Sequence, residues 1–204
     1  MASVGGMDDD MRKADLLEAV LQRTQAVVAG VPAGAGHDPT PCTEWDVARL
    51  TRHMVGWVDA FAEAVATGAM RPGDPDDVTV TDAAAQYRAS AERLLAAWRA
   101  GDGPDGEYRL TGDSPVPGRF LYPMMLGEYV THGWDLAKAT GQPLDWPDEG
   151  ATLALESMRA MVKPEHRGPD GWVGEEVEVG PDAPPLAKLV AFTGRNPAWE
   201  PPAR

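Results

Sequence analysis

Five stretches of this chain carry apolar residues at helical spacing, and loops rich in proline and glycine separate them. Apolar side chains that recur every three or four residues mark one face of an α-helix. The spacing predicts helices over 8–30, 43–68, 81–100 and 119–140, and a fifth from Pro147 to Pro164. Long amphipathic helices joined by short connections favour an all-α fold, an antiparallel four-helix bundle with one additional helix.

The ends of these elements carry weaker signals. Thr43 and Asp46 have the spacing of a capping box, which places the start of the second helix near Thr43. The irregular stretch between the third and fourth helices contains a short extended piece at Tyr108–Leu110. After the fifth helix we expect a strand at Val177–Val179 and a short helix at 184–193.

Length and composition agree with one globular domain. The chain has 204 residues, of which 43% are hydrophobic, enough for a full core. We expect a disordered lead over 1–7, the helix bundle over 8–164, and a small C-terminal appendage over 165–204 that packs on the bundle.

The charge balance excludes several classes of partner. The net charge is −14 at pH 7, whereas nucleic-acid binding needs a basic surface. The same negative charge disfavours docking on anionic membranes. No apolar run approaches a membrane span, and the first residues lack a signal-peptide pattern. Cys42 is the single cysteine, so no disulfide can form within the chain, and a cytoplasmic protein is the default expectation.

Three polar residues interrupt the apolar stripes of the second and fourth helices: His53, Glu128 and His132. Glu128 and His132 are four residues apart, so their side chains are neighbours on one helical face. A buried carboxylate and two buried imidazoles are costly unless something satisfies them. A divalent metal would do so, and two histidines with one glutamate form a ligand set of catalytic zinc sites. The alternative is a hydrogen-bonded Glu128–His132 pair with His53 near a helix end.

Nearby residues have possible supporting roles. Asp135 follows His132 by three residues and is placed to orient a ligand imidazole, or else to hold a backbone group. Trp57, one turn after His53, is the best candidate for a pocket wall, with a core position as the alternative. Cys42 precedes the second helix, where a lowered pKa would make it a nucleophile; a small buried side chain is the more common role of a free cysteine.

Three stretches resemble one known family: 39–53 (PTPCTEWDVARLTRH), 128–142 (EYVTHGWDLAKATGQ) and 189–197 (LVAFTGRNP). They are similar to the DinB/YfiT-like superfamily, and within it to the actinobacterial group of mycothiol-dependent maleylpyruvate isomerase-like metal-binding proteins. The resemblance implies a DinB-like four-helix bundle with a divalent metal held by His53, Glu128 and His132. Zinc is the metal that it implies first, although nickel, iron or manganese also suit two imidazoles and a carboxylate.

The resemblance also implies a function. Some relatives are thiol-dependent isomerases or transferases that use mycothiol or bacillithiol. We therefore expect a metal-dependent transferase or isomerase that uses such a thiol and acts on an electrophilic small molecule. Only about 40 residues follow the fifth helix, whereas the isomerase has a larger C-terminal domain, so maleylpyruvate itself is not the expected substrate. A hydrolase or lyase that uses metal-bound water, and a non-catalytic metal- or ligand-binding protein, are the alternatives. A homodimer is a further expectation.

Overall fold

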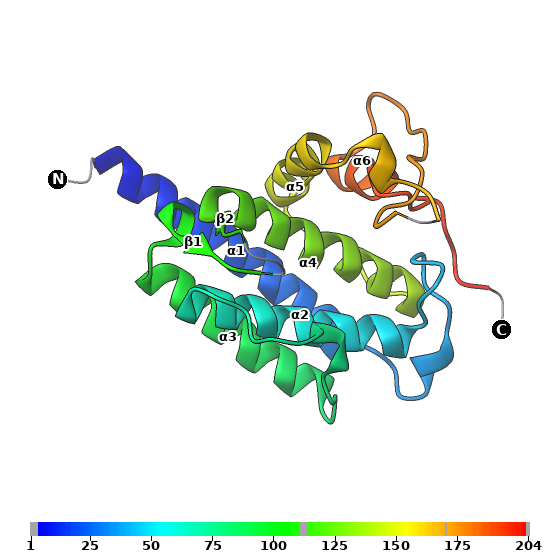
Figure 1. The fold of residues 1–204 in the computed structure, drawn as a ribbon. Coiled ribbons are helices and arrows are strands. Elements are labelled where there is room, and N and C mark those ends of the chain that lie inside the picture. Colours follow the sequence, from blue (N-terminus) through cyan, green and yellow to red (C-terminus); the bar gives the residue numbers. More distant parts are fainter. Residues whose placement is uncertain (1–3, 111–113, 170, 203–204) are drawn as a thin grey trace.

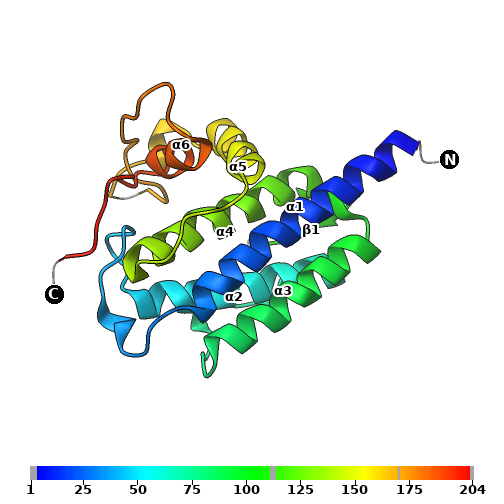
Figure 2. The ribbon, with the colours of Figure 1, turned by 180° about the vertical axis from the view of Figure 1, so that it is seen from behind.

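Four long helices form the body of the molecule: α1 (Val4–Ala29), α2 (Val47–Thr67), α3 (Ala83–Ala100) and α4 (Gly118–Thr140) (Figure 1). The computed structural model describes residues 4–110, 114–169 and 171–202. Both α1 and α2 contact α3 and α4, so the four helices close into a bundle. Figure 2 shows α1 lying between α3 and α4 on the rear face. The all-α, DinB-like bundle predicted from apolar spacing is confirmed.

The apolar stripes meet in the centre of the bundle. One leucine from each helix has no exposed surface: Leu17, Leu50, Leu94 and Leu121. Burying such a side chain contributes roughly 1.5–3 kcal/mol relative to leaving it in water. The packed stripes therefore fix how α2 and α4 are rotated, and with them the polar residues that share the stripes.

Two further helices lie outside the bundle. α5 (Asp148–Met161) packs on α4, and α6 (Pro185–Phe192) packs on α5, which confirms the short helix predicted over 184–193. β1 (Glu107–Tyr108) and β2 (Val116–Pro117) form a small antiparallel pair that pairs Tyr108 with Val116. Short 3-10 turns complete the fold: η1 (Ala35–His37), η2 (Pro75–Asp77), η3 (Gly103–Asp105) and η4 (Pro164–His166).

Three local predictions differ from the structure. α2 begins at Val47 rather than near Thr43, because Asp46 is the N-cap and its side chain accepts from the Arg49 amide at 2.8 Å. The strand predicted at Val177–Val179 is wrong, since the described residues there form no strand and the Val177 amide donates to the Ala191 carbonyl instead.

The lead expected to be disordered over 1–7 also differs. α1 already begins at Val4, while residues 1–3 lie outside the described part of the chain. None of the described helices combines the length and the apolar character that a membrane crossing needs.

Candidate metal centre

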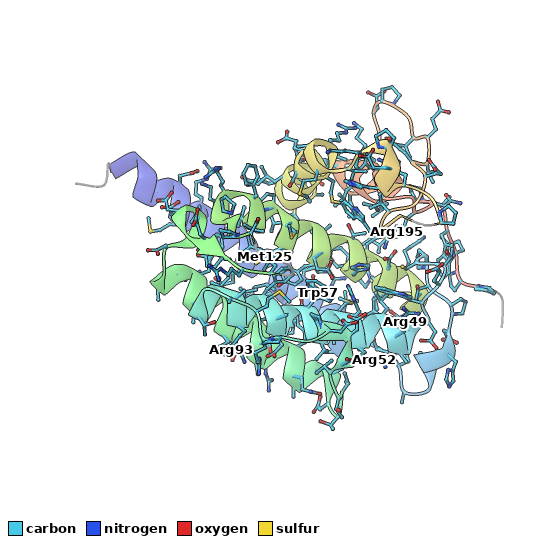
Figure 3. All side chains as sticks on the ribbon, viewed as in Figure 1. Arg49, Arg52, Trp57, Arg93, Met125 and Arg195 are labelled. Atoms are coloured by element: carbon cyan, nitrogen blue, oxygen red, sulfur yellow. The ribbon has the colours of Figure 1, made fainter. Side chains whose placement is uncertain are left out.

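The structure brings His53, Glu128 and His132 together between α2 and α4. One ligand-competent atom from each residue lies within 4.8 Å of the others. His53 is only 8% exposed. In Figure 3, Trp57 marks the region where α2 faces α4, and Arg195 approaches α4 from the side of α6. The three residues singled out from the sequence are therefore neighbours, and metal binding by them stays a prediction.

The outer nitrogen of each imidazole is held by a carboxylate. His53 Nδ1 lies 2.8 Å from Asp76 Oδ1, and His132 Nδ1 lies 3.2 Å from Asp135 Oδ2. An ionised carboxylate only accepts hydrogen bonds, so in both rings Nδ1 carries the proton and donates. Asp135 thus lies beside the His132 ring, and its role as an orienting residue stays a prediction.

The inner nitrogens of both rings face the same carboxylate. His53 Nε2 lies 2.9 Å from Glu128 Oε1, and His132 Nε2 lies 3.8 Å from Glu128 Oε2. In a neutral ring whose Nδ1 holds the proton, Nε2 presents a lone pair. A lone pair that points at a carboxylate oxygen is unfavourable unless a cation, a proton or a metal ion, lies between them.

Glu128 is held in its ionised form. Burial raises the pKa of its carboxyl group, but the charges of His132 and His53 outweigh burial and lower it to about 2. Burial lowers the pKa of His53, whereas the carboxylates of Glu128 and Asp76 raise it and prevail. The cluster thus stabilises positive charge at its centre.

Asp76 reaches the site from the loop between α2 and α3, where sequence analysis did not single it out. Its turn, η2, begins after Asp74, whose side chain accepts from the Asp76 amide at 2.9 Å. Gly56 on α2 lets this turn approach, because a Cβ there would lie 2.0 Å from the Pro75 carbonyl oxygen. Nothing in the sequence separated Asp76 from the other aspartates of this loop.

Arg195 was also missed as part of the site, although it lies in one of the stretches that carry the family resemblance. Its Nε and an Nη donate to the Asp135 carboxylate at 2.9–3.2 Å. Asp135 has no exposed side-chain surface, and the side chain of Arg195 is 11% exposed. Burial raises the pKa of Asp135, but Arg195 and His132 oppose it and lower the pKa overall.

Gly194 places this arginine. Its φ is 89°, and a Cβ on it would lie 2.5 Å from the Cα of Gly174. Only glycine fits such a left-handed, close approach. The Arg195 amide then donates to the Val190 carbonyl at 2.9 Å, which fastens the residue after α6.

With both imidazoles neutral, the charged side chains around the cluster do not balance. Among the described residues, the carboxylates of Glu128, Asp76 and Asp135 and the guanidinium of Arg195 then leave two negative charges. One divalent cation, or two protons on the imidazoles, would neutralise them. The residues present therefore fit a divalent metal in both donor type and charge.

Two tryptophans flank the imidazoles. The Trp57 ring centroid lies 5.8 Å from that of His53 and 5.4 Å from that of Phe61. The Trp45 ring lies 4.4 Å from His53 and stacks on His132 at 5.5 Å with an interplanar angle of 22°. Trp57, the wall residue predicted from the sequence, lies beside the cluster, and its role as a pocket wall stays a prediction.

Cys42 lies in the loop before α2 and is partly buried. Burial raises its pKa to about 11, although the charge of Arg195 opposes the rise. A thiol with a raised pKa is mostly protonated at neutral pH and is a poor nucleophile. This environment favours the small buried side chain over the nucleophile.

Two hollows border the loop that carries Asp76. One of about 450 Å³ is lined in part by Thr51, Arg52 and Val78, and one of about 300 Å³ by Gly56 and residues 71–75. Neither is lined by His53, Glu128 or His132. The three clustered residues therefore lie outside both hollows.

Sequence comparison identifies the family of the chain. Residues 17–137 match the family model described as the mycothiol maleylpyruvate isomerase N-terminal domain. This match covers α2, the η2 loop and α4 as far as residue 137, and so spans the three clustered residues and both carboxylates behind them. The chain belongs to this family, as the resemblance of its motifs implied.

The relatives found are mycobacterial and carry no assigned function. Uncharacterized protein Rv0738 of Mycobacterium tuberculosis (strain H37Rv) is 34% identical over 171 residues, covering 84% of this chain and 91% of that one. Uncharacterized protein Rv0036c of the same strain is 30% identical over 145 residues, covering 61% and 55%. No solved structure matches the chain.

Proposed function

We propose that His53, Glu128 and His132 bind a divalent cation, and that the protein uses it to activate a low-molecular-weight thiol of the mycothiol type. The thiol would attack an electrophilic small molecule in a transferase or isomerase reaction. One observation carries the proposal: the Nε2 atoms of both imidazoles face the Glu128 carboxylate, at 2.9 Å for His53 and 3.8 Å for His132. Family membership supports the choice of thiol.

A bound divalent cation would supply the Lewis acidity that keeps a thiol ionised at neutral pH. The chain's own residues prepare the site for it. Asp76 and Asp135 accept from Nδ1 of the two rings, which leaves Nε2 of each ring as the atom that would bind the cation, and Arg195 holds Asp135 in place. Carboxylates behind ligand histidines also raise their basicity as donors.

Zinc is the cation that we propose first, because two imidazoles, one carboxylate and a free position form a ligand set of catalytic zinc sites. Nickel, iron and manganese accept the same donor types. A hydrolase that activates water would further need a general base beside the cluster. The carboxylates of Asp76 and Asp135 lie closest to that role, but both already accept hydrogen bonds from the imidazoles. Because a metal-activated thiol needs no such base, the thiol reaction is better supported.

The first experiment measures metal content by mass spectrometry in the purified protein and in His132→Gln. We expect about one equivalent of divalent metal per chain in the wild type, as a single three-residue site requires. The variant should lose it while keeping its helical circular dichroism. His37→Gln is the matched control, because the His37 side chain is 99% exposed and lies outside the cluster. Full metal content in His132→Gln would contradict the ligand assignment.

A second experiment tests the thiol. Mycothiol should raise the melting temperature of the zinc-loaded protein and leave the metal-free protein unchanged. Conjugation of an electrophile such as 1-chloro-2,4-dinitrobenzene should then need both the metal and the thiol. Turnover of ester or amide probes without thiol would favour the hydrolase, and ligand binding without any turnover would favour a non-catalytic binding protein.

A further inference from the structure

The Trp45 ring lies against both cluster histidines. Its ring stacks on His132 with an interplanar angle of 22° and lies 4.4 Å from His53, centroid to centroid. The two imidazoles are themselves 4.9 Å apart, edge to face. A single indole therefore spans both candidate ligand rings from the side of the loop that precedes α2.

A guanidinium also contacts this indole. The guanidinium of Arg49 lies over the Trp45 ring, 5.2 Å from its centroid, as in a cation–π contact. Arg49 and His53 are one helical turn apart on α2, and Figure 3 shows Arg49 on the α2 side of the space between α2 and α4. The indole thus contacts one guanidinium and both imidazoles.

The backbone holds Trp45 in this position. Its carbonyl accepts from Thr40 Oγ1 at 2.8 Å, and its amide donates to the Cys42 carbonyl at 2.8 Å. The loop closes at its ends, where the Val47 amide donates to the Asp38 carbonyl at 3.0 Å. These bonds keep the indole on the imidazoles rather than leaving it to a mobile loop.

We propose that Trp45 is a positioning residue that shields the two imidazoles from solvent and limits how many water molecules reach a cation held there. Excluding water strengthens the electrostatic interactions of a site and leaves fewer competitors for an incoming ligand. The part that concerns the cation rests on the proposed function. The shielding of the rings does not, and it can be tested on the metal-free protein.

The first test uses diethyl pyrocarbonate, which modifies accessible histidines, with site-resolved mass spectrometry on the protein in EDTA. We expect Trp45→Ala to increase the modification rate of His53 and His132 severalfold. His37, with a side chain 99% exposed, should react at the same rate in every variant and serves as the internal standard. Equal rates at His53 and His132 in wild type and Trp45→Ala would overturn the proposal.

Two further variants serve as controls for this test. Trp172→Ala is the matched control, because Trp172 is an exposed tryptophan that contacts His166, outside the cluster, and it should leave the rates at His53 and His132 unchanged. Trp45→Phe keeps a smaller aromatic ring, so it should give an increase in the same direction but smaller than that of Trp45→Ala. If Trp45→Ala loses its helical circular dichroism, Trp45→Phe decides: unchanged rates there would also overturn the proposal.

The second test loads the protein with Co²⁺, whose visible absorption is intense at low coordination number and weak when water completes six ligands. Trp45→Ala should weaken these bands severalfold at equal cobalt content, while Trp172→Ala keeps them. An unchanged spectrum in Trp45→Ala would refute the effect on coordination. Failure of the wild type to bind cobalt would instead count against the proposed metal site. The histidine modification would still test whether Trp45 shields His53 and His132.

Discussion

Replacing Arg195 with methionine should destabilise the protein far more than a loss of side-chain packing would. The guanidinium makes contacts of 2.9–3.2 Å with an Asp135 carboxylate that has no exposed surface. Removing one partner of a buried ion pair leaves the other charge uncompensated, which costs about 3–5 kcal/mol. The remaining donor to that carboxylate is the imidazole of His132.

The change is large enough to measure by thermal unfolding. For a domain of this size, 1 kcal/mol lowers the melting temperature by roughly 2–4 °C, so we expect a drop of about 6–20 °C for Arg195→Met in the metal-free protein. Adding Asp135→Asn should recover a large part of the loss, because the uncompensated charge is then gone. Removing both charges of a buried pair is often close to neutral.

Arg12→Met is the matched control. Arg12 pairs with Glu149 at 3.3 Å, but these side chains are 74% and 59% exposed. An exposed pair contributes at most about 1 kcal/mol. If Arg195→Met lowers the melting temperature no more than Arg12→Met does, or if Asp135→Asn adds to the loss, Arg195 does not neutralise Asp135 as argued.

Three more predictions follow from the site. Asp76→Asn keeps an acceptor for His53 Nδ1 but removes the negative charge of residue 76. It should weaken zinc binding about 10–100-fold in a competition titration against a chelator. Equal zinc affinity in the variant and the wild type would show that Asp76 does not support His53 as a ligand. The metal-free protein should be most stable between about pH 4.5 and 6.5. Glu128 has a lowered pKa, so its contribution to the free energy of unfolding is lost as the pH falls below 4.5 towards 2. His53 has a raised pKa, so its contribution is lost as the pH rises above 6.5 through the pKa of the folded state. Melting temperatures in EDTA would check this, and zinc should reverse the alkaline loss. Cys42, whose pKa is about 11, should react with iodoacetamide at pH 7 much more slowly than free cysteine, and fast alkylation would restore it as a candidate nucleophile.

The predictions from the sequence were most accurate for the helices, whose positions follow from the spacing of apolar residues along the chain. The apolar stripes defined the four bundle helices and the short helix near the end, because burial of one helical face fixes both the helix and its rotation. The strand expected at Val177–Val179 failed because alternating apolar residues favour a strand only where a partner strand exists. Here the Val177 amide bonds to the end of α6 instead.

The same distinction holds within the candidate centre. Residues on α2 and α4 were found because helical spacing predicts which side chains share a face. The other contributors, Trp45, Asp76 and Arg195, lie on loops whose course depends on tertiary contacts. No spacing rule connects Arg195 to Asp135, 60 residues earlier in the chain. Trp45 is one of seven tryptophans in the chain, and only the structure shows that it stacks on His132.

Gly56 shows how a position without any functional group can govern chemistry. It follows His53 by one turn on α2, and the absence of a Cβ there lets the Pro75 carbonyl lie against the helix. A single methyl group would push the loop outwards and draw Asp76 away from His53, although no ligand had changed. Among variants of this protein, loss of metal affinity would then map to a residue that a search for donors, acids or nucleophiles would pass over. In sequences that keep the cluster, tolerance to substitution at this position should be as low as at the ligands themselves.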